Sequence, residues 1–294
     1  MSRVVAVHGI AQQYESPKQL HDVWLSALEG GFQNAKLPPL SASDLSVVFW
    51  GDLFRDPAEP LKSIDSSLGP PSKGEEEFEL KFLLAMAEEA ARLRGLPPAS
   101  EEETEAVSKS SLRTKLAANA LRLINELPAV QYLAERGSLD VVLRGSLRQV
   151  AAYLTRPAMR WSMLDRFAQE IQPDTCVVIG HSLGSVIAYE GLYEGKAPNV
   201  RCFITLGSPL GIRGLVFDRL KSTLEGKPGA WPGNVKEWSN FADEGDVVAL
   251  ERDLRKGFSE NVKNLKVDNG AEVHSAVHYL TEPEVAHATA RWLD

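Results

Sequence analysis

Four short apolar runs constrain the fold of this chain more than any other feature of its sequence. They are rich in Val and Ile, and none alternates cleanly with polar residues as a strand with one solvated face would. Such runs are typical of strands buried on both faces, in a parallel sheet covered by helices. The runs are Arg3–Val7 before His8-Gly9, Leu45–Trp50 before Gly51-Asp52, Thr175–Ile179 before Gly180, and Val200–Leu206 before Gly207.

Amphipathic segments separate these runs, and strand alternating with helix predicts an α/β fold with a mostly parallel sheet. We expect helices over Lys18–Phe32, Pro157–Ile171 and Ser185–Tyr193. Two further strands are expected at Val235–Phe241 and Asn261–Val267, followed by a closing helix from about Glu284 to Leu293.

The stretch between the second and third strands breaks this rhythm. It is punctuated by prolines and has no strand signal, while helical apolar patterns cover Glu75–Arg94, Leu112–Leu127 and Leu139–Leu154. We therefore predict an α/β core of residues 1–52 and 157–294, interrupted by a helical insertion of residues 53–156.

The charge of this region is divided. Residues 73–106 hold ten acids and four bases, a net −6, whereas residues 109–166 hold ten bases and four acids, a net +6. The simpler interpretation is two solvated faces that partly neutralise each other. The alternative is a peripheral membrane or protein contact made through the insertion.

Composition limits the partners and the compartment. The chain has 294 residues and a net charge of −8, which disfavours nucleic acid as a partner because phosphate binding needs a basic face. Two cysteines give no disulfide framework, and the apolar run Val4–Val7 is too short for a signal-peptide core or a membrane span. We expect a cytoplasmic protein without cofactors.

The strongest chemical signal is Gly180-His181-Ser182-Leu183-Gly184, which lies between a predicted strand and a predicted helix. This is a G-x-S-x-G nucleophile elbow in its required context. Ser182 must adopt a strained backbone conformation there, and the tight turn leaves no room for side chains at the two glycines. The amides that begin the helix would point at an oxygen that gains negative charge.

A second signal is the run Val4–Val7 followed by His8-Gly9-Ile10. Alone it would be an ordinary strand ending in glycine. Beside the elbow, it predicts an oxyanion hole formed by the backbone N–H groups of Ile10 and Leu183.

Together these residues resemble the α/β-hydrolase superfamily. The likeness extends to residues 205–211, Thr-Leu-Gly-Ser-Pro-Leu-Gly, and is strongest toward the lipase and esterase branch near GPI inositol-deacylase-like and lecithin–cholesterol-acyltransferase-like proteins. It covers residues 1–52 and 157–294, and it implies a serine hydrolase that cleaves carboxylic esters through a Ser-His-Asp triad.

The superfamily's order of serine, acid and histidine directs the search for the other two residues. Asp243 and Asp246 follow the strand ending at Phe241, and the resemblance favours Asp246, with Asp243 as a loop cap. His274 is favoured over His278, because His274-Ser275 followed by Tyr279 resembles the family's histidine run.

The i, i+4 spacing of His274 and His278 also fits a zinc site, but position 275 is not Glu and no third ligand is obvious, so we expect no metal. The insertion is predicted to form a lid over a small-molecule or lipid ester. The alternatives are a scaffold module with weak or lost chemistry, and a serine peptidase.

Overall fold

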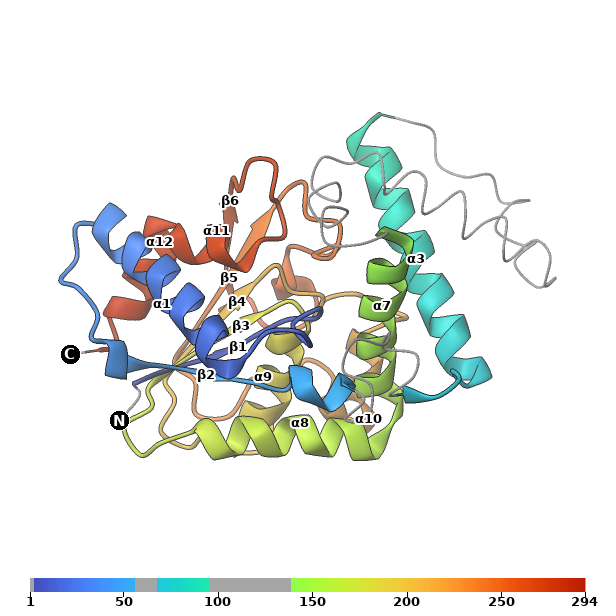
Figure 1. Ribbon diagram of the computed structural model, residues 1–294, viewed down its shortest axis with the longest axis horizontal. Helices are drawn as coiled ribbons and strands as arrows, with labels where there is room; N and C mark the ends of the chain where they lie inside the picture. The colour runs from blue at the N-terminus through green and yellow to red at the C-terminus, as the bar shows by residue number, and fades with distance from the viewer. Residues whose placement is uncertain (1–2, 56–67, 96–138, 294) are drawn as a thin grey trace.

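The computed structural model describes residues 3–55, 68–95 and 139–293, and they contain a six-stranded sheet with helices on both sides (Figure 1). Every neighbouring pair of strands in this sheet is parallel, and the order is β2-β1-β3-β4-β5-β6. The predicted α/β class is confirmed. The strands are β1 (Val4–Val7), β2 (Leu45–Val48), β3 (Val177–His181), β4 (Cys202–Leu206), β5 (Glu237–Asp243) and β6 (Lys263–Val267).

Successive side chains of the central strands enter two separate cores. Val5 and Val7 of β1 pack with α8 (Pro157–Glu170) and α9 (Leu183–Tyr193), and Val178 of β3 joins them. The residues between them face α1 (Pro17–Asn34), α11 (Ala276–Thr281) and α12 (Pro283–Ala290) instead. Because side chains alternate across a strand and both faces are covered, both sets are apolar, which explains the unbroken runs of Val and Ile.

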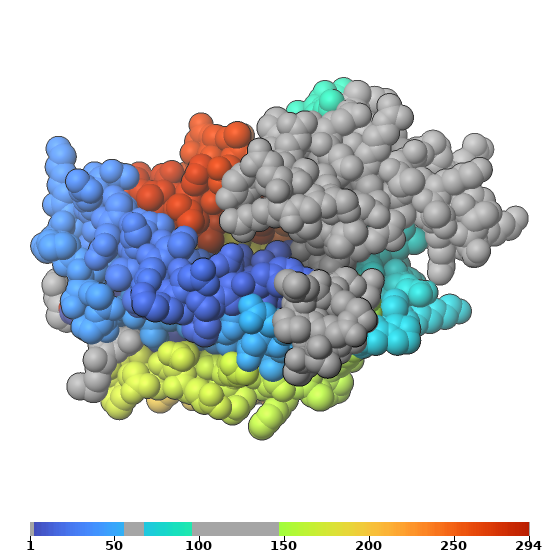
Figure 2. Space-filling view, in the orientation of Figure 1, coloured from blue at the N-terminus to red at the C-terminus, as the bar shows by residue number. Residues whose placement is uncertain are grey.

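The helices divide between the two faces of the sheet in Figure 1. α1 (Pro17–Asn34), α11 (Ala276–Thr281) and α12 (Pro283–Ala290) lie together on one face, while α8, α9 and α10 (Lys221–Leu224) lie on the other. Figure 2 shows α1 and the C-terminal segment as one continuous surface, with α8 along the opposite side of the view. Short 3₁₀ turns are η1 (Ala42–Asp44), η2 (Gly51–Phe54), η4 (Phe217–Arg219) and η5 (Leu254–Lys256).

Two helices of the predicted insertion belong to the same core as the sheet. Phe78 and Phe82 of α3 (Lys73–Leu93) and Leu147 of α7 (Leu139–Thr155) join the cluster that contains Val7. The two helices pack against each other beside the sheet (Figure 1). The helix expected over 112–127 lies outside the described residues.

Ion pairs join the acidic and basic parts of the insertion. Arg156 Nε lies 2.5 Å from Glu75 Oε1, and the hydrogen bond from Arg156 lowers the pKa of Glu75 to about 2. Arg148 Nε lies 3.9 Å from Glu79 Oε1. The two halves therefore neutralise part of each other's charge within the described residues.

The observed boundaries differ from the expected ones mainly at strand ends. β5 continues two residues beyond Phe241, because Asp243 pairs with Val267 of β6. The sequence patterns do not predict α11, a helix of six residues. Among the described residues, no helix is both long enough and apolar enough to cross a membrane.

Candidate active site

Ser182 stands at the junction of β3 and α9 in a strained backbone conformation. Its φ is 51° and its ψ is −129°, a geometry that costs a non-glycine residue on the order of 1–3 kcal/mol. The surrounding structure holds it there: Ser182 N–H donates to Leu206 O at 3.0 Å, and Ser182 O accepts from Ser185 Oγ at 2.6 Å. Only 2% of the surface of Ser182 is exposed to solvent.

Three glycines near Ser182 leave no room for a side chain, because neighbouring atoms lie close to their Cα atoms. A Cβ on Gly180 would lie 2.5 Å from Ser185 Cα, and one on Gly184 would lie 2.2 Å from Val7 O. A Cβ on Gly9 would lie 2.8 Å from Ser182 Cβ, closer than real Cβ contacts. The loop after β1 therefore lies directly against the turn that carries Ser182, and this close approach leaves no room for a side chain at Gly9, Gly180 or Gly184.

His8 shapes this loop in its neutral form. Trp50 N–H donates to His8 Nε2 at 3.1 Å, so the ring proton is on Nδ1, which donates to Gly9 O at 2.6 Å. The indole N–H of Trp50 also donates to His8 O at 3.1 Å. Burial lowers the pKa of His8 to about 4. His8 is thus a structural residue that fixes the chain leading to Ile10.

The two amides predicted to form an oxyanion hole come from segments that adjoin Ser182, one in sequence and one in space. Leu183 is the first residue of α9, where helical N–H groups have no partner within the helix. Ile10 follows Gly9, which contacts Ser182. Within the described residues, no protein acceptor takes up either N–H.

Asp246 is a fully buried carboxylate with four hydrogen-bond donors. Its Oδ2 accepts from His274 Nδ1 at 2.8 Å and from the Tyr279 hydroxyl at 2.9 Å. Its Oδ1 accepts from Val248 N at 2.9 Å and from Ala249 N at 3.3 Å. Burial alone would raise the pKa of Asp246, but the adjacent His274 and the donors outweigh it, and the pKa is lowered.

His274 is held in the tautomer that a general base needs. Because Nδ1 donates to Asp246, Nε2 carries the lone pair, and this atom is buried without a hydrogen-bond partner among the described residues. The neighbour of Ser182, His181, donates from Nε2 to His274 O at 3.0 Å, with ring centroids 4.6 Å apart. Burial lowers the pKa of His181 to about 3, so it stays neutral. The structure thus joins Asp246 to His274 and places His274 against His181, the residue before Ser182. Among the described residues, no hydrogen bond joins the Ser182 hydroxyl to His274 Nε2.

The alternates Asp243 and His278 have other partners. Asp243 accepts from Gly245 N at 2.7 Å and from Asn269 N at 2.6 Å, so it organises the loops after β5 and β6. His278 Nδ1 donates to Asn269 O at 2.9 Å, and its Nε2 lies 3.6 Å from Glu272. The geometry therefore joins Asp246 to His274 and leaves the alternates in loop-forming contacts.

One contact of the site was not expected from sequence. The hydroxyl of Tyr279 accepts from Asp243 N at 2.9 Å while it donates to Asp246. In the sequence, Tyr279 stands out only as part of a run that resembles the family's histidine segment. Its contact with the acid depends on how α11 packs, and nothing in the sequence signals that.

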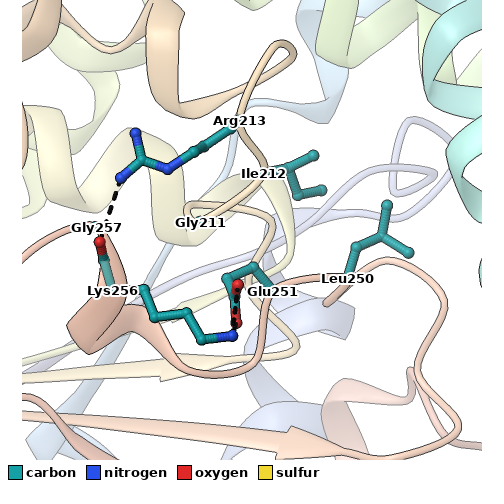
Figure 3. A pocket seen from close by; sticks show the side chains of 7 residues that line it. All are labelled: Gly211, Ile212, Arg213, Leu250, Glu251, Lys256 and Gly257. Atoms are coloured by element: carbon teal, nitrogen blue, oxygen red, sulfur yellow. Dashed lines mark hydrogen bonds and ion pairs between the residues drawn. The ribbon is translucent and has the colours of Figure 1, made fainter.

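A pocket of about 250 Å³ lies apart from these residues, between the loops that follow β4 and β5 (Figure 3). Its cations already have protein partners: Lys256 Nζ lies 3.0 Å from Glu251 Oε1, and Arg213 donates to Lys256 O at 3.2 Å. Among the described residues, no group of three or more His, Cys, Asp or Glu is arranged to hold a metal ion. The lining residues are Gly211, Ile212, Arg213, Leu250, Glu251, Lys256 and Gly257.

Comparisons of the chain with protein-family models, with curated proteins and with solved structures found no match.

Proposed function

We propose that this chain is a serine hydrolase of the α/β-hydrolase type that cleaves carboxylic esters. Ser182 is the nucleophile, His274 the general base and Asp246 the residue that orients the base. One observation carries most of the support: a 2.8 Å hydrogen bond from His274 Nδ1 to the buried Asp246 leaves His274 Nε2 without a partner, and the His274 ring packs against His181, the residue before the strained Ser182.

The reaction would proceed by acyl transfer. His274 Nε2 takes the hydroxyl proton as Ser182 Oγ attacks the ester carbonyl, and the amides of Ile10 and Leu183 stabilise the oxyanion. Asp246 stabilises the imidazolium. His274 then gives its proton to the leaving alcohol, and an acyl-enzyme remains. Water, deprotonated by His274, attacks the acyl-enzyme, releases the acid and restores Ser182.

The helical insertion would act in this proposal as a cap over the substrate site. Support comes from α7, whose Gln149 accepts a hydrogen bond from Ala11 N at 3.1 Å, one residue after Ile10. Charged and leucine-rich faces of the insertion would then determine which lipid or small-molecule esters enter.

The scaffold alternative also has a specific observation in its favour. Only 2% of Ser182 is exposed, and the pocket of Figure 3 lies elsewhere. For a substrate to reach Ser182, the groups that cover it would have to move. An interaction module would need no such movement.

The test is hydrolysis of p-nitrophenyl esters of increasing acyl length, alongside peptide p-nitroanilides. We expect the wild type to turn over esters, and Ser182→Ala to lose turnover by orders of magnitude while keeping its fold. Ser43→Ala, at an exposed serine, is the matched control and should equal the wild type. Undiminished turnover in Ser182→Ala would overturn the proposal, and faster cleavage of amides than of esters would favour a peptidase.

A further inference from the structure

The loop that carries the Ile10 amide is bound from the other side by a helix of the insertion. Gln149 of α7 is fully buried. Its Oε1 accepts from Ala11 N at 3.1 Å, and its Nε2 donates to Gln13 Oε1 at 3.1 Å. A buried amide without partners would be costly, so both ends of this side chain are used to hold one short loop.

The bond to Ala11 restrains the peptide next to Ile10. Ala11 has a φ of 63°, a left-handed conformation that costs an L-residue roughly 1–2 kcal/mol. Its N–H lies in the peptide plane that follows Ile10, so fixing that N–H fixes the orientation of the plane. On the other side of Ile10, Gly9 is pressed against Ser182. The Ile10 amide is therefore set between two fixed points.

The segment that follows β2 also contacts this loop. A Cβ on Gly51 would lie 2.6 Å from Gln12 O, so the backbone there approaches closely. Arg55 donates hydrogen bonds to Gln13 O and to Glu15 O. Gln149 of α7 bonds the same loop from the helical insertion.

We propose that Gln149 is a positioning residue for the oxyanion-hole amide of Ile10, and that the insertion acts on catalysis through this side chain. The inference rests on the proposed function. Gln149 contacts no reacting atom. It orients the backbone N–H of Ile10, which would contact the oxyanion.

The test is Gln149→Met, which keeps the length of the side chain and removes both hydrogen bonds. Loss of one oxyanion donor costs about 10²–10³ in kcat, so a misdirected donor should cost about tenfold to a hundredfold. KM should change by no more than about twofold, because the amide stabilises the transition state and not the bound ester. The rate of fluorophosphonate labelling at Ser182 should fall with kcat, since the phosphoryl oxygen uses the same amides.

Tyr153→Phe is the matched control on the same helix. It removes the buried 2.6 Å hydrogen bond from Tyr153 to Glu190, away from the loop. We expect its Tm to fall about as far as that of Gln149→Met while kcat stays at the wild-type value. If Gln149→Met lacks a cooperative unfolding transition, Gln149→Asn replaces it with the same expected loss, because it keeps the amide but shortens its reach.

A wild-type kcat in folded Gln149→Met would overturn the inference, as would equal losses of kcat in Gln149→Met and Tyr153→Phe. Both outcomes leave the proposed function standing, because wild-type turnover and its dependence on Ser182 are measured in the same experiment. A wild type with neither turnover nor adduct would overturn the proposed function, and this inference with it.

Discussion

His274 Nδ1 lies 2.8 Å from Oδ2 of Asp246, a carboxylate with no solvent exposure and four donors around it. We predict that Asp246→Asn lowers kcat by roughly 10⁴, because an amide at this position favours the wrong tautomer of the imidazole. Steady-state ester hydrolysis measures it. Asp243→Asn is the matched comparison: it weakens loop contacts, so stability should fall while kcat stays within about tenfold. An equal loss of kcat in folded Asp243→Asn would contradict the assignment of the acid.

Tyr279→Phe removes one donor from Asp246 and the acceptor of Asp243 N–H. A buried amide left unpaired costs about 1–3 kcal/mol, so the free energy of unfolding should fall by that amount in urea titrations. The carboxylate would retain His274 and two amides, and we expect kcat to fall only about tenfold. Wild-type values of both quantities would show that the Tyr279 hydroxyl does not support the acid.

Stability should decline as the solution is acidified below pH 6.5. The pKa values of His8 and His181 are lowered to about 4 and about 3 by burial, against 6.5 when unfolded. The unfolded chain therefore binds more protons in this window, so this contribution to stability is complete well above pH 6.5 and is lost as the pH falls toward the folded-state pKa values. Between pH 6.5 and 5 the two residues together remove about 3 kcal/mol.

Urea unfolding at several pH values measures this loss. His181→Asn should halve the pH dependence, whereas His287→Asn, at an exposed position of α12, should leave it unchanged. A wild-type stability that is flat from pH 6.5 to 5 would mean that the buried histidines accept protons in the folded state.

Gly9→Ala tests the contact between the loop after β1 and the elbow. The added Cβ would meet Ser182 Cβ at 2.8 Å and His181 Nδ1 at 3.0 Å, so loop and serine must separate. We expect kcat to fall about a hundredfold, because a small misplacement of reacting groups has that effect. Gly74→Ala in α3, where nothing lies within 4 Å of the added Cβ, is the control and should match the wild type. Full activity in Gly9→Ala would mean that the contact does not position the serine.

Sequence patterns were sufficient to predict the sheet, because strands buried on both faces leave unbroken apolar runs. They were also sufficient to place Ser182 on a strand-to-helix turn, because Gly180 and Gly184, two residues to either side, suit a tight turn between a strand and a helix. The choice between Asp243 and Asp246 needed coordinates. β5 extends to Asp243, and only packing shows that its carboxylate is occupied by loop amides while Asp246 meets His274.

Other contacts of the site leave no trace in a single sequence. In the sequence, Gln149 is one polar residue of a helical pattern. In the structure it is fully buried against a loop more than a hundred positions earlier in the chain. In the sequence, Tyr279 stands out only as part of the run resembling the family's histidine segment, and its contact with Asp246 follows from the packing of α11 against α1 and α12. Local propensity determines where helices form, but tertiary packing determines which polar group each of their faces meets.

The proposed chemistry depends most directly on an activated Ser182, which intact-mass measurement with a fluorophosphonate tests. We predict one covalent adduct on the wild type, a single adduct on Ser43→Ala, and none on Ser182→Ala. The absence of an adduct on folded wild type, or an adduct that persists in Ser182→Ala, would contradict the assignment of Ser182 as the nucleophile.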